Sequence, residues 1–180
     1  MQKKYILRAL CLALCAIFLF SFAGCSSDDE SKDKDTKKAK NEDAVAKVDS
    51  SMKKYESSVY SIDLTGEVDT VIVYHKDDVI YGIDQHSIAE AGDRSKADIE
   101  ALLEKVEERY AELSKKDFVK FKAYYSEDLK SLIMTLKARK LDNKENLQAV
   151  ADLGIFGALS GDSTFKEFED TLLKMKFVKK

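Results

Sequence analysis

The feature that most constrains this chain is an uninterrupted apolar run that ends shortly before a cysteine. Residues 9–20, "ALCLALCAIFLF", are all apolar and follow a basic segment at the start of the sequence. A helix that spans a bilayer needs about 20 residues, so this run is too short for one, and it has the length of the hydrophobic region of a secretory signal peptide. Small residues and Cys25 come next. We therefore expect residues 1–24 to be a signal peptide that is absent from the mature protein.

The end of this segment resembles the lipobox of bacterial lipoproteins. It reads Phe22-Ala23-Gly24-Cys25, with an aromatic residue where an aliphatic one is usual. The resemblance implies that Cys25 becomes the N-terminus of the mature chain and carries a diacylglycerol thioether with fatty acyl chains such as palmitate. The alternative is a secreted protein whose cleavage site happens to precede a cysteine.

Cysteine content and charge narrow the possible partners. Cys11 and Cys15 lie within the expected signal peptide, so Cys25 is the only cysteine of the mature chain and has no partner for an internal disulfide. Cleavage removes three of the 30 basic side chains and none of the 33 acidic ones, which leaves a net charge of −6. That charge argues against nucleic acid as a partner. The expected partners are the membrane, through lipidated Cys25, and an unidentified envelope protein or small ligand.

The next segment has the composition of a linker. Residues 25–57 are dominated by Asp, Glu, Lys and Ser, with Tyr55 as the only aromatic side chain. Such a segment cannot bury enough apolar surface to offset its ordering entropy, so we expect a flexible tether. Apolar side chains recur at helical spacing in its second half, so a docked helix over residues 41–57 stays open. Residues 58–180 are then one globular domain.

Two stretches of alternating apolar residues predict a first β-hairpin. Residues 68–75 and 79–86 are rich in β-branched and aromatic side chains, and Asp77 and Asp78 lie between them as a two-residue turn. In this register Tyr74 lies opposite Tyr81. Alternation then predicts one core face, which consists of Ile72, Tyr74, Val79, Tyr81 and Ile83.

Residues 95–114 predict an amphipathic helix. Ser95 is a good N-cap, with the negative charge of Asp98 three residues later. The apolar stripe of this helix recurs every three or four residues and consists of Ile99, Leu102, Leu103, Val106, Tyr110 and Leu113.

The rest of the chain predicts a second hairpin and two further helices. Apolar residues alternate on both sides of the turn sequence "SED", a short helix follows a cap at Asn143, and a closing helix carries Phe165, Phe168 and Leu172 on one stripe. The order is ββ-α-ββ-α-α. It predicts an α+β fold in which an antiparallel sheet of two hairpins is covered on one face by helices.

This layout resembles the YehR-like family of small bacterial lipoproteins. The resemblance rests on the lipobox, the hairpin "TVIVYHKDDVIYG", the helix "SKADIEALL", the second hairpin and the final helix that runs into "KFVKK". It covers residues 68–180 and the lipobox. It implies a fold and a location in the cell envelope, and it supplies no catalytic residues.

One patch of the first hairpin has candidate metal ligands. In the predicted register His86 lies opposite Asp69 and beside Asp84 on the face away from the core. Two carboxylates and an imidazole are ligands for a divalent cation, but a slip of one residue abolishes the set. A solvated polar patch is the favoured interpretation, and we expect neither a metal nor another cofactor.

The loop before the closing helix is the candidate binding surface. Ile155, Phe156 and Leu159 lie among glycines, where they form either the lip of a docking surface or a plug for the end of the core. The plug is the favoured interpretation. The sequence has no "G-x-S-x-G", "H-E-x-x-H" or phosphate-binding loop motif, so we expect no catalytic residues and no enzyme.

These features predict a lipid-anchored, non-enzymatic envelope lipoprotein that acts as a binding or interaction module. The alternatives are a carrier of a small hydrophobic ligand and a metal-dependent envelope factor. The expected location is the cell membrane on its extracytoplasmic side, or the outer membrane if the host has two membranes.

Overall fold

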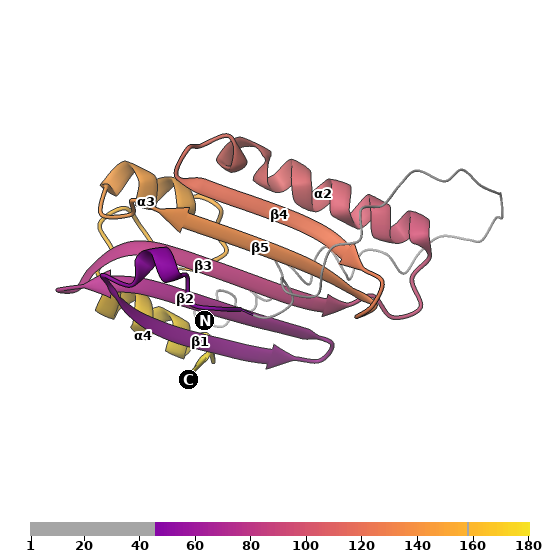
Figure 1. The fold of residues 1–180 in the computed structure, drawn as a ribbon, viewed down its shortest axis with the longest axis horizontal. Coiled ribbons are helices and arrows are strands. Elements are labelled where there is room, and N and C mark those ends of the chain that lie inside the picture. The colour runs from indigo at the N-terminus through magenta and orange to yellow at the C-terminus, as the bar shows by residue number, and fades with distance from the viewer. Residues whose placement is uncertain (1–45, 158) are drawn as a thin grey trace, which may run out of the picture.

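A computed structural model describes residues 46–157 and 159–180 of the chain. These residues form a six-stranded antiparallel sheet with the strand order β4-β5-β3-β2-β1-β6, and three α-helices (Figure 1). The predicted α+β class is confirmed.

The first three strands form a meander. They are β1 (Glu56–Leu64), β2 (Glu67–Lys76) and β3 (Val79–Glu90). The turn between β2 and β3 has two residues, as predicted, and both Asp77 and Asp78 have positive φ, 50° and 66°. This combination of φ angles matches the right-handed twist of a hairpin and favours Asp, Asn or Gly.

A β-bulge changes the register of this hairpin. His75 pairs with Ile80, but Tyr74 pairs with Gly82, so Tyr81 is an extra residue on β3. The predicted pairing of Tyr74 with Tyr81 is therefore wrong, and every pair beyond the bulge is shifted by one residue.

Helix α2 (Lys96–Ser114) links this meander to a second hairpin, β4 (Val119–Ser126) and β5 (Ser131–Arg139). Ser95 caps α2 through a capping box with Asp98, as the sequence indicates. Strand β5 pairs with β3, which joins the two hairpins into one sheet.

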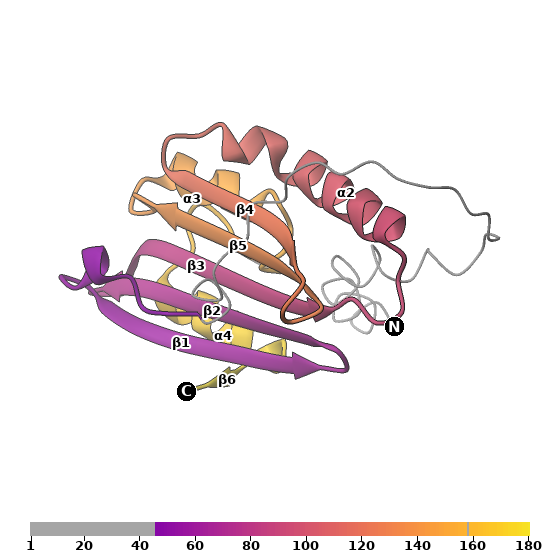
Figure 2. The ribbon, with the colours of Figure 1, turned by 45° about the vertical axis from the view of Figure 1, so that its right-hand side comes forward.

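Helices α3 (Lys144–Ala151) and α4 (Phe165–Lys174) follow, and strand β6 (Val178–Lys179) pairs with β1. Figures 1 and 2 show α4 behind β2 and α2 alongside β4. No helix in the described part of the chain is long and apolar enough to span a membrane.

The two faces of the sheet bury different side chains. The face toward the helices, called here the helix face, carries the main core, which includes Val71, Val73, Ile83 and Leu136. The opposite face, the outer face, carries a small second core of Met52, Ile72 and Tyr74. The predicted core face therefore combined residues of both: Ile72, Tyr74 and Tyr81 belong to the outer face, Ile83 belongs to the helix face, and Val79 is exposed.

Residues 46–55, which come directly before β1, dock on the outer face. A short 3₁₀-helix, η2 (Ser50–Met52), takes the place of the helix that the sequence left open, and Met52 is 8% exposed. Tyr55 stacks on Tyr81 with ring centroids 4.2 Å apart. Within the predicted tether, Asp49, Met52 and Tyr55 contact the sheet, and Glu56 and Ser57 belong to β1. We call residues 46–55 the arm.

Candidate functional site

The three metal-ligand candidates do not come together. Asp84 lies on the outer face with His86, which pairs with Thr70, whereas Asp69 pairs with Ser87 and lies on the helix face. The bulge at Tyr81 causes this difference, because a shift of one residue moves a side chain to the other face of a sheet. No group of three or more His, Cys, Asp or Glu side chains in residues 46–157 and 159–180 is arranged to hold a metal ion. Asp69 therefore lies on the opposite face of the sheet from the other two candidate ligands, Asp84 and His86.

The same shift places a group of polar side chains on the helix face. Glu67 and Asp69 extend the side of β2 that carries Val71 and Val73, and Gln85 and Ser87 extend the facing side of β3. These four residues are 7%, 8%, 5% and 3% exposed. We call Glu67, Asp69, Gln85 and Ser87 the acceptor cluster.

Three oxygens of the acceptor cluster lack a hydrogen-bond donor. Glu67 Oε1, Asp69 Oδ1 and Gln85 Oε1 are buried and have no partner among the described residues. Gln85 Nε2 donates to Ser87 Oγ at 3.4 Å, and Ser87 also donates to Asp69. A buried polar atom that has no partner costs about 1–3 kcal/mol, and folded proteins contain few of them.

Burial also changes the titration of the acceptor cluster. Burial, and secondly the neighbouring Asp69 carboxylate, raise the pKa of Glu67 to about 7. Burial raises the pKa of Asp69 as well, against the opposing effects of the Ser87 hydrogen bond and of His86. Both carboxyl groups are therefore easier to bury in the protonated form than as carboxylates.

Apolar and aromatic side chains of α2 lie on the same side of the sheet. Ile99 and Leu102, in the first half of α2, are 7% and 4% exposed. Tyr110 stacks on Phe121 of β4 with centroids 4.3 Å apart. Burial raises the pKa of Tyr110 to about 12, against the opposing effect of Arg109.

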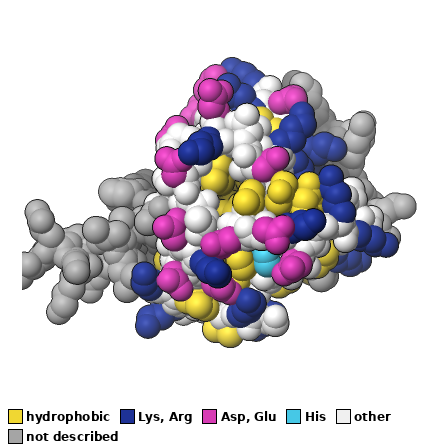
Figure 3. Space-filling view, turned by 90° about the vertical axis from the view of Figure 1, so that its left-hand side faces the viewer, with side chains coloured by type: hydrophobic (Ala, Val, Ile, Leu, Met, Phe, Trp, Pro, Cys, Tyr) yellow, Lys and Arg dark blue, Asp and Glu magenta, His cyan; other side chains and the backbone are white. Residues whose placement is uncertain are grey.

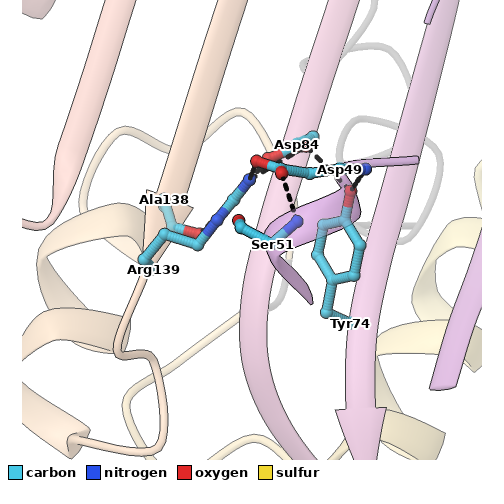
Figure 4. Close-up of polar contacts among 6 residues, drawn as sticks. All are labelled: Asp49, Ser51, Tyr74, Asp84, Ala138 and Arg139. Carbon is cyan, nitrogen blue, oxygen red and sulfur yellow. Dashed lines mark hydrogen bonds and ion pairs between the residues drawn. The ribbon is translucent and has the colours of Figure 1, made fainter. Parts of the chain in front are cut away.

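A second polar group lies on the outer face and fastens the arm (Figure 4). Arg139 Nη2 donates to Asp49 Oδ2 at 2.8 Å and to Asp84 Oδ2 at 3.2 Å, and Nη1 donates to Asp84 Oδ1. Tyr74 Oη accepts from the backbone N–H of Asp49 at 2.8 Å and donates to Asp84 at 3.0 Å. We call Asp49, Tyr74, Asp84 and Arg139 the arginine clasp.

The charges of the arginine clasp compensate one another. A hydrogen bond from the Ser51 backbone, and then Arg139, hold the pKa of Asp49 far below its usual range. Burial lowers the pKa of Arg139, but Asp84 and Asp49 raise it by more. The pKa of the guanidinium is therefore above its usual value. This arrangement fits a structural role, because each charged group of the clasp forms an ion pair within it.

The loop residues predicted as a candidate surface are buried. Ile155, Phe156 and Leu159 are 7%, 2% and 7% exposed and belong to the main core. Phe156 packs edge-on against Phe168 of α4, with centroids 5.5 Å apart. The loop therefore plugs the end of the core, and these three side chains do not form an exposed docking surface.

Figure 3 shows the end of the molecule where the β2–β3 turn lies, with a band of hydrophobic side chains bordered by charged ones.

Sequence reasoning missed the acceptor cluster and the clasp for different reasons. Glu67 and Asp69 stand four and two residues before Val71, so a carboxylate pair on an apolar face could have been recognised once the strand was extended to residue 67. Asp49 and Arg139 are 90 residues apart, and no local pattern predicts their contact.

The fold has relatives among solved structures. No protein-family model matches the chain, and no curated protein matches it. The NMR structure of the YehR protein of E. coli is similar with a TM-score of 0.53 and 16% identity, over 69% of this chain and 90% of that one. The NMR structure of a protein from Streptococcus pneumoniae TIGR4 matches with a TM-score of 0.45 and 13% identity, over 87% of this chain and all of that one (100%). The comparison with YehR therefore shows that this chain has a YehR-like fold.

Proposed function

We propose that this protein is a lipid-anchored, non-enzymatic binding module of the cell envelope, and that it takes a small polar ligand at the acceptor cluster. The observation that carries the proposal is the set of three buried oxygens without a donor, Glu67 Oε1, Asp69 Oδ1 and Gln85 Oε1. Three unsatisfied acceptors on one face of a sheet are a substantial cost, and a ligand that donates hydrogen bonds offsets it.

The anchoring part of the proposal is supported by the resemblance of Phe22–Cys25 to a lipobox. These residues lie outside the described part of the chain. The arm docks on the outer face, whereas the acceptor cluster lies on the helix face and roughly 17 Å away along β2, counted from Tyr74 to Asp69. A module anchored through its N-terminus would thus keep its binding site apart from the point of attachment.

The acceptor cluster favours a polar ligand over a small hydrophobic one. A carrier of a small hydrophobic ligand would need an apolar pocket, and the loop around Phe156 is the candidate binding surface of the sequence, but that side chain is 2% exposed and packed in the core. Oxygen acceptors select for polar donors, so a polar ligand suits the described interior better than a purely hydrophobic one.

The ligand-binding part is tested by native mass spectrometry of the acylated protein, purified in mild detergent from its own host. We expect a noncovalent small-molecule adduct that is lost in the Asp69→Asn variant and kept in Asp63→Asn, an exposed carboxylate of β1. The absence of any adduct, together with no response to added ligands of any class, would remove this proposal.

The anchoring part is tested by a Cys25→Ser variant. We expect the wild-type chain in the membrane fraction, with an N-terminal peptide whose mass includes the diacylglycerol and acyl chains. Cys25→Ser should lose both the modification and the membrane association. A wild-type N-terminal peptide with an unmodified thiol would contradict the lipid anchor and leave the ligand-binding part standing.

A further inference from the structure

We propose that the acceptor cluster binds the primary ammonium group of a small organic molecule. This inference rests on the proposed function, because it names the ligand class of the same site.

The chemistry of the unpaired atoms indicates the ligand. With the carboxyl groups ionised, all three are acceptors, two on carboxylates and one on an amide. A primary ammonium has three N–H donors and no acceptor, so it can donate to Asp69 and to a neighbouring oxygen of the cluster at the same time. A carboxylate or phosphate ligand would add further acceptors and negative charge, which this site disfavours.

The register of the strands places Asp69 between the other two residues that have an unpaired oxygen. Asp69 pairs directly with Ser87, so Gln85 is its diagonal neighbour on the same face, and Glu67 is two residues from Asp69 in the other direction along β2. Diagonal neighbours across strands are about 7–8 Å apart and residues two apart in a strand about 7 Å, so an ammonium beside Asp69 lies within reach of a long side chain on either side. The hydrogen bond from Gln85 Nε2 to Ser87 Oγ fixes the amide with its oxygen free.

The surroundings favour an organic cation over a metal ion. Calcium takes six to eight oxygen ligands. In the acceptor cluster, by comparison, three side-chain oxygens lack a partner. Val71 is the next residue after Asp69 on this face of β2, pairs with Gln85 and belongs to the main apolar core. Such an apolar neighbour suits the hydrocarbon part of an amine and does not replace the water of a metal ion.

The test is isothermal titration and thermal unfolding of the full acylated protein in detergent at pH 8. The probes are 1,4-diaminobutane and n-butylamine, with tetramethylammonium as a cation without N–H groups and calcium as a metal. We expect both amines to bind and to raise the unfolding temperature, and we expect no response to tetramethylammonium or calcium at equal concentration.

Variants locate the effect. Asp69→Asn and Glu67→Gln should each weaken amine binding about tenfold or more, because each replaces a charged acceptor with a neutral one. Asp63→Asn, on the outer face, should bind as the wild type does. Circular dichroism confirms that each variant is folded. If one variant is unfolded, the other still decides the outcome.

Several results would overturn the inference: no response to either amine, an equal response to tetramethylammonium, binding that survives both cluster substitutions, or tighter binding of calcium. A native adduct that is a metal ion or a neutral molecule would also overturn it, while the proposed binding function would stand. No adduct and no response to any probe would overturn both.

Discussion

At the scale of single residues, Glu67 is an ionisable side chain that the fold buries. It is a carboxylate that is 7% exposed, and one of its oxygens lacks a partner among the described residues. Its pKa is about 7 in the fold, against 4.5 for the unperturbed group. Around neutral pH the protein therefore holds a proton that the unfolded chain would have released.

This shift has a definite sign for stability. Between pH 4.5 and 7 the unfolded chain loses the Glu67 proton and the folded chain keeps it, so this group makes the free energy of unfolding fall as pH rises. We expect Glu67→Gln, which cannot ionise, to be more stable than the wild type at pH 8 by about 2–3 kcal/mol and nearly equal to it at pH 5. Urea unfolding at the two pH values measures the difference. An equal difference between wild type and variant at both pH values would show that ionisation of Glu67 does not lower the free energy of unfolding.

At the scale of elements, the β-bulge decides which side of β2 and β3 faces the helices. Gly82 follows the bulge, and a Cβ atom there would lie 3.0 Å from Ala138 O, 3.0 Å from Met52 Cε and 3.3 Å from Tyr74 Cδ2. The strand needs a glycine at this position because the arm packs directly on it.

We expect Gly82→Ala to destabilise the protein by about 1–3 kcal/mol and to loosen the arm, because the added methyl group displaces Met52. Chemical unfolding gives the energy, and limited proteolysis within residues 46–55 reports the arm. In a Met52→Ala background the same substitution should cost less, since one of the close contacts is gone. An equal cost in both backgrounds would place the strain on the Ala138 side instead.

Much of the element layout could be predicted from periodicity. The alternating residues of β2 to β5, the capping box at Ser95 and the stripe of α4 are local signals, and the structure confirms them. Strand β1 was missed because its sequence "ESSVYSIDL" begins with polar residues that continue the composition of the linker. It is a strand because β2 pairs with its whole length, from Glu56 opposite His75 to Leu64 opposite Glu67.

The candidate site depended on one residue of register. Nothing in the hairpin sequence marks Tyr81 as an extra residue, and in the fold Tyr81 stacks on Tyr55 of the arm. The shift of one residue separates Asp69 from Asp84 and His86 and brings Asp69 opposite Ser87. Successive side chains of a strand point to opposite faces of the sheet. The local sequence therefore predicts which residues share a face, but it does not predict which of the two faces is covered by the helices.

At the scale of the whole molecule, the arginine clasp connects parts of the chain that are far apart in sequence. It joins the arm to β2, β3 and β5, on the face that the helices leave uncovered. The side chains of Arg139 and Asp84 are 21% and 8% exposed, so removal of one partner leaves a charge in a poorly solvated place.

We expect Arg139→Met to lower the free energy of unfolding by about 2–4 kcal/mol, because Asp49 and Asp84 lose their common counter-ion. Asp49→Asn should cost less, since Arg139 keeps Asp84. Lys140→Met, which removes the exposed pair with Asp117, is the matched control and should leave stability unchanged. Chemical unfolding of the three variants gives the comparison, and a loss for Lys140→Met as large as for Arg139→Met would show that burial of the clasp is unimportant.

The clasp also determines how a mechanical load would travel through the protein. A pull on the chain ahead of Asp49 would, without the clasp, act on the start of β1 and open its hydrogen bonds with β2 one pair at a time. Arg139 instead passes the force to β5 and β3, two interior strands that are bonded on both sides. Tension from the N-terminal side would therefore be shared with β3 and β5 and would not act on β1 alone.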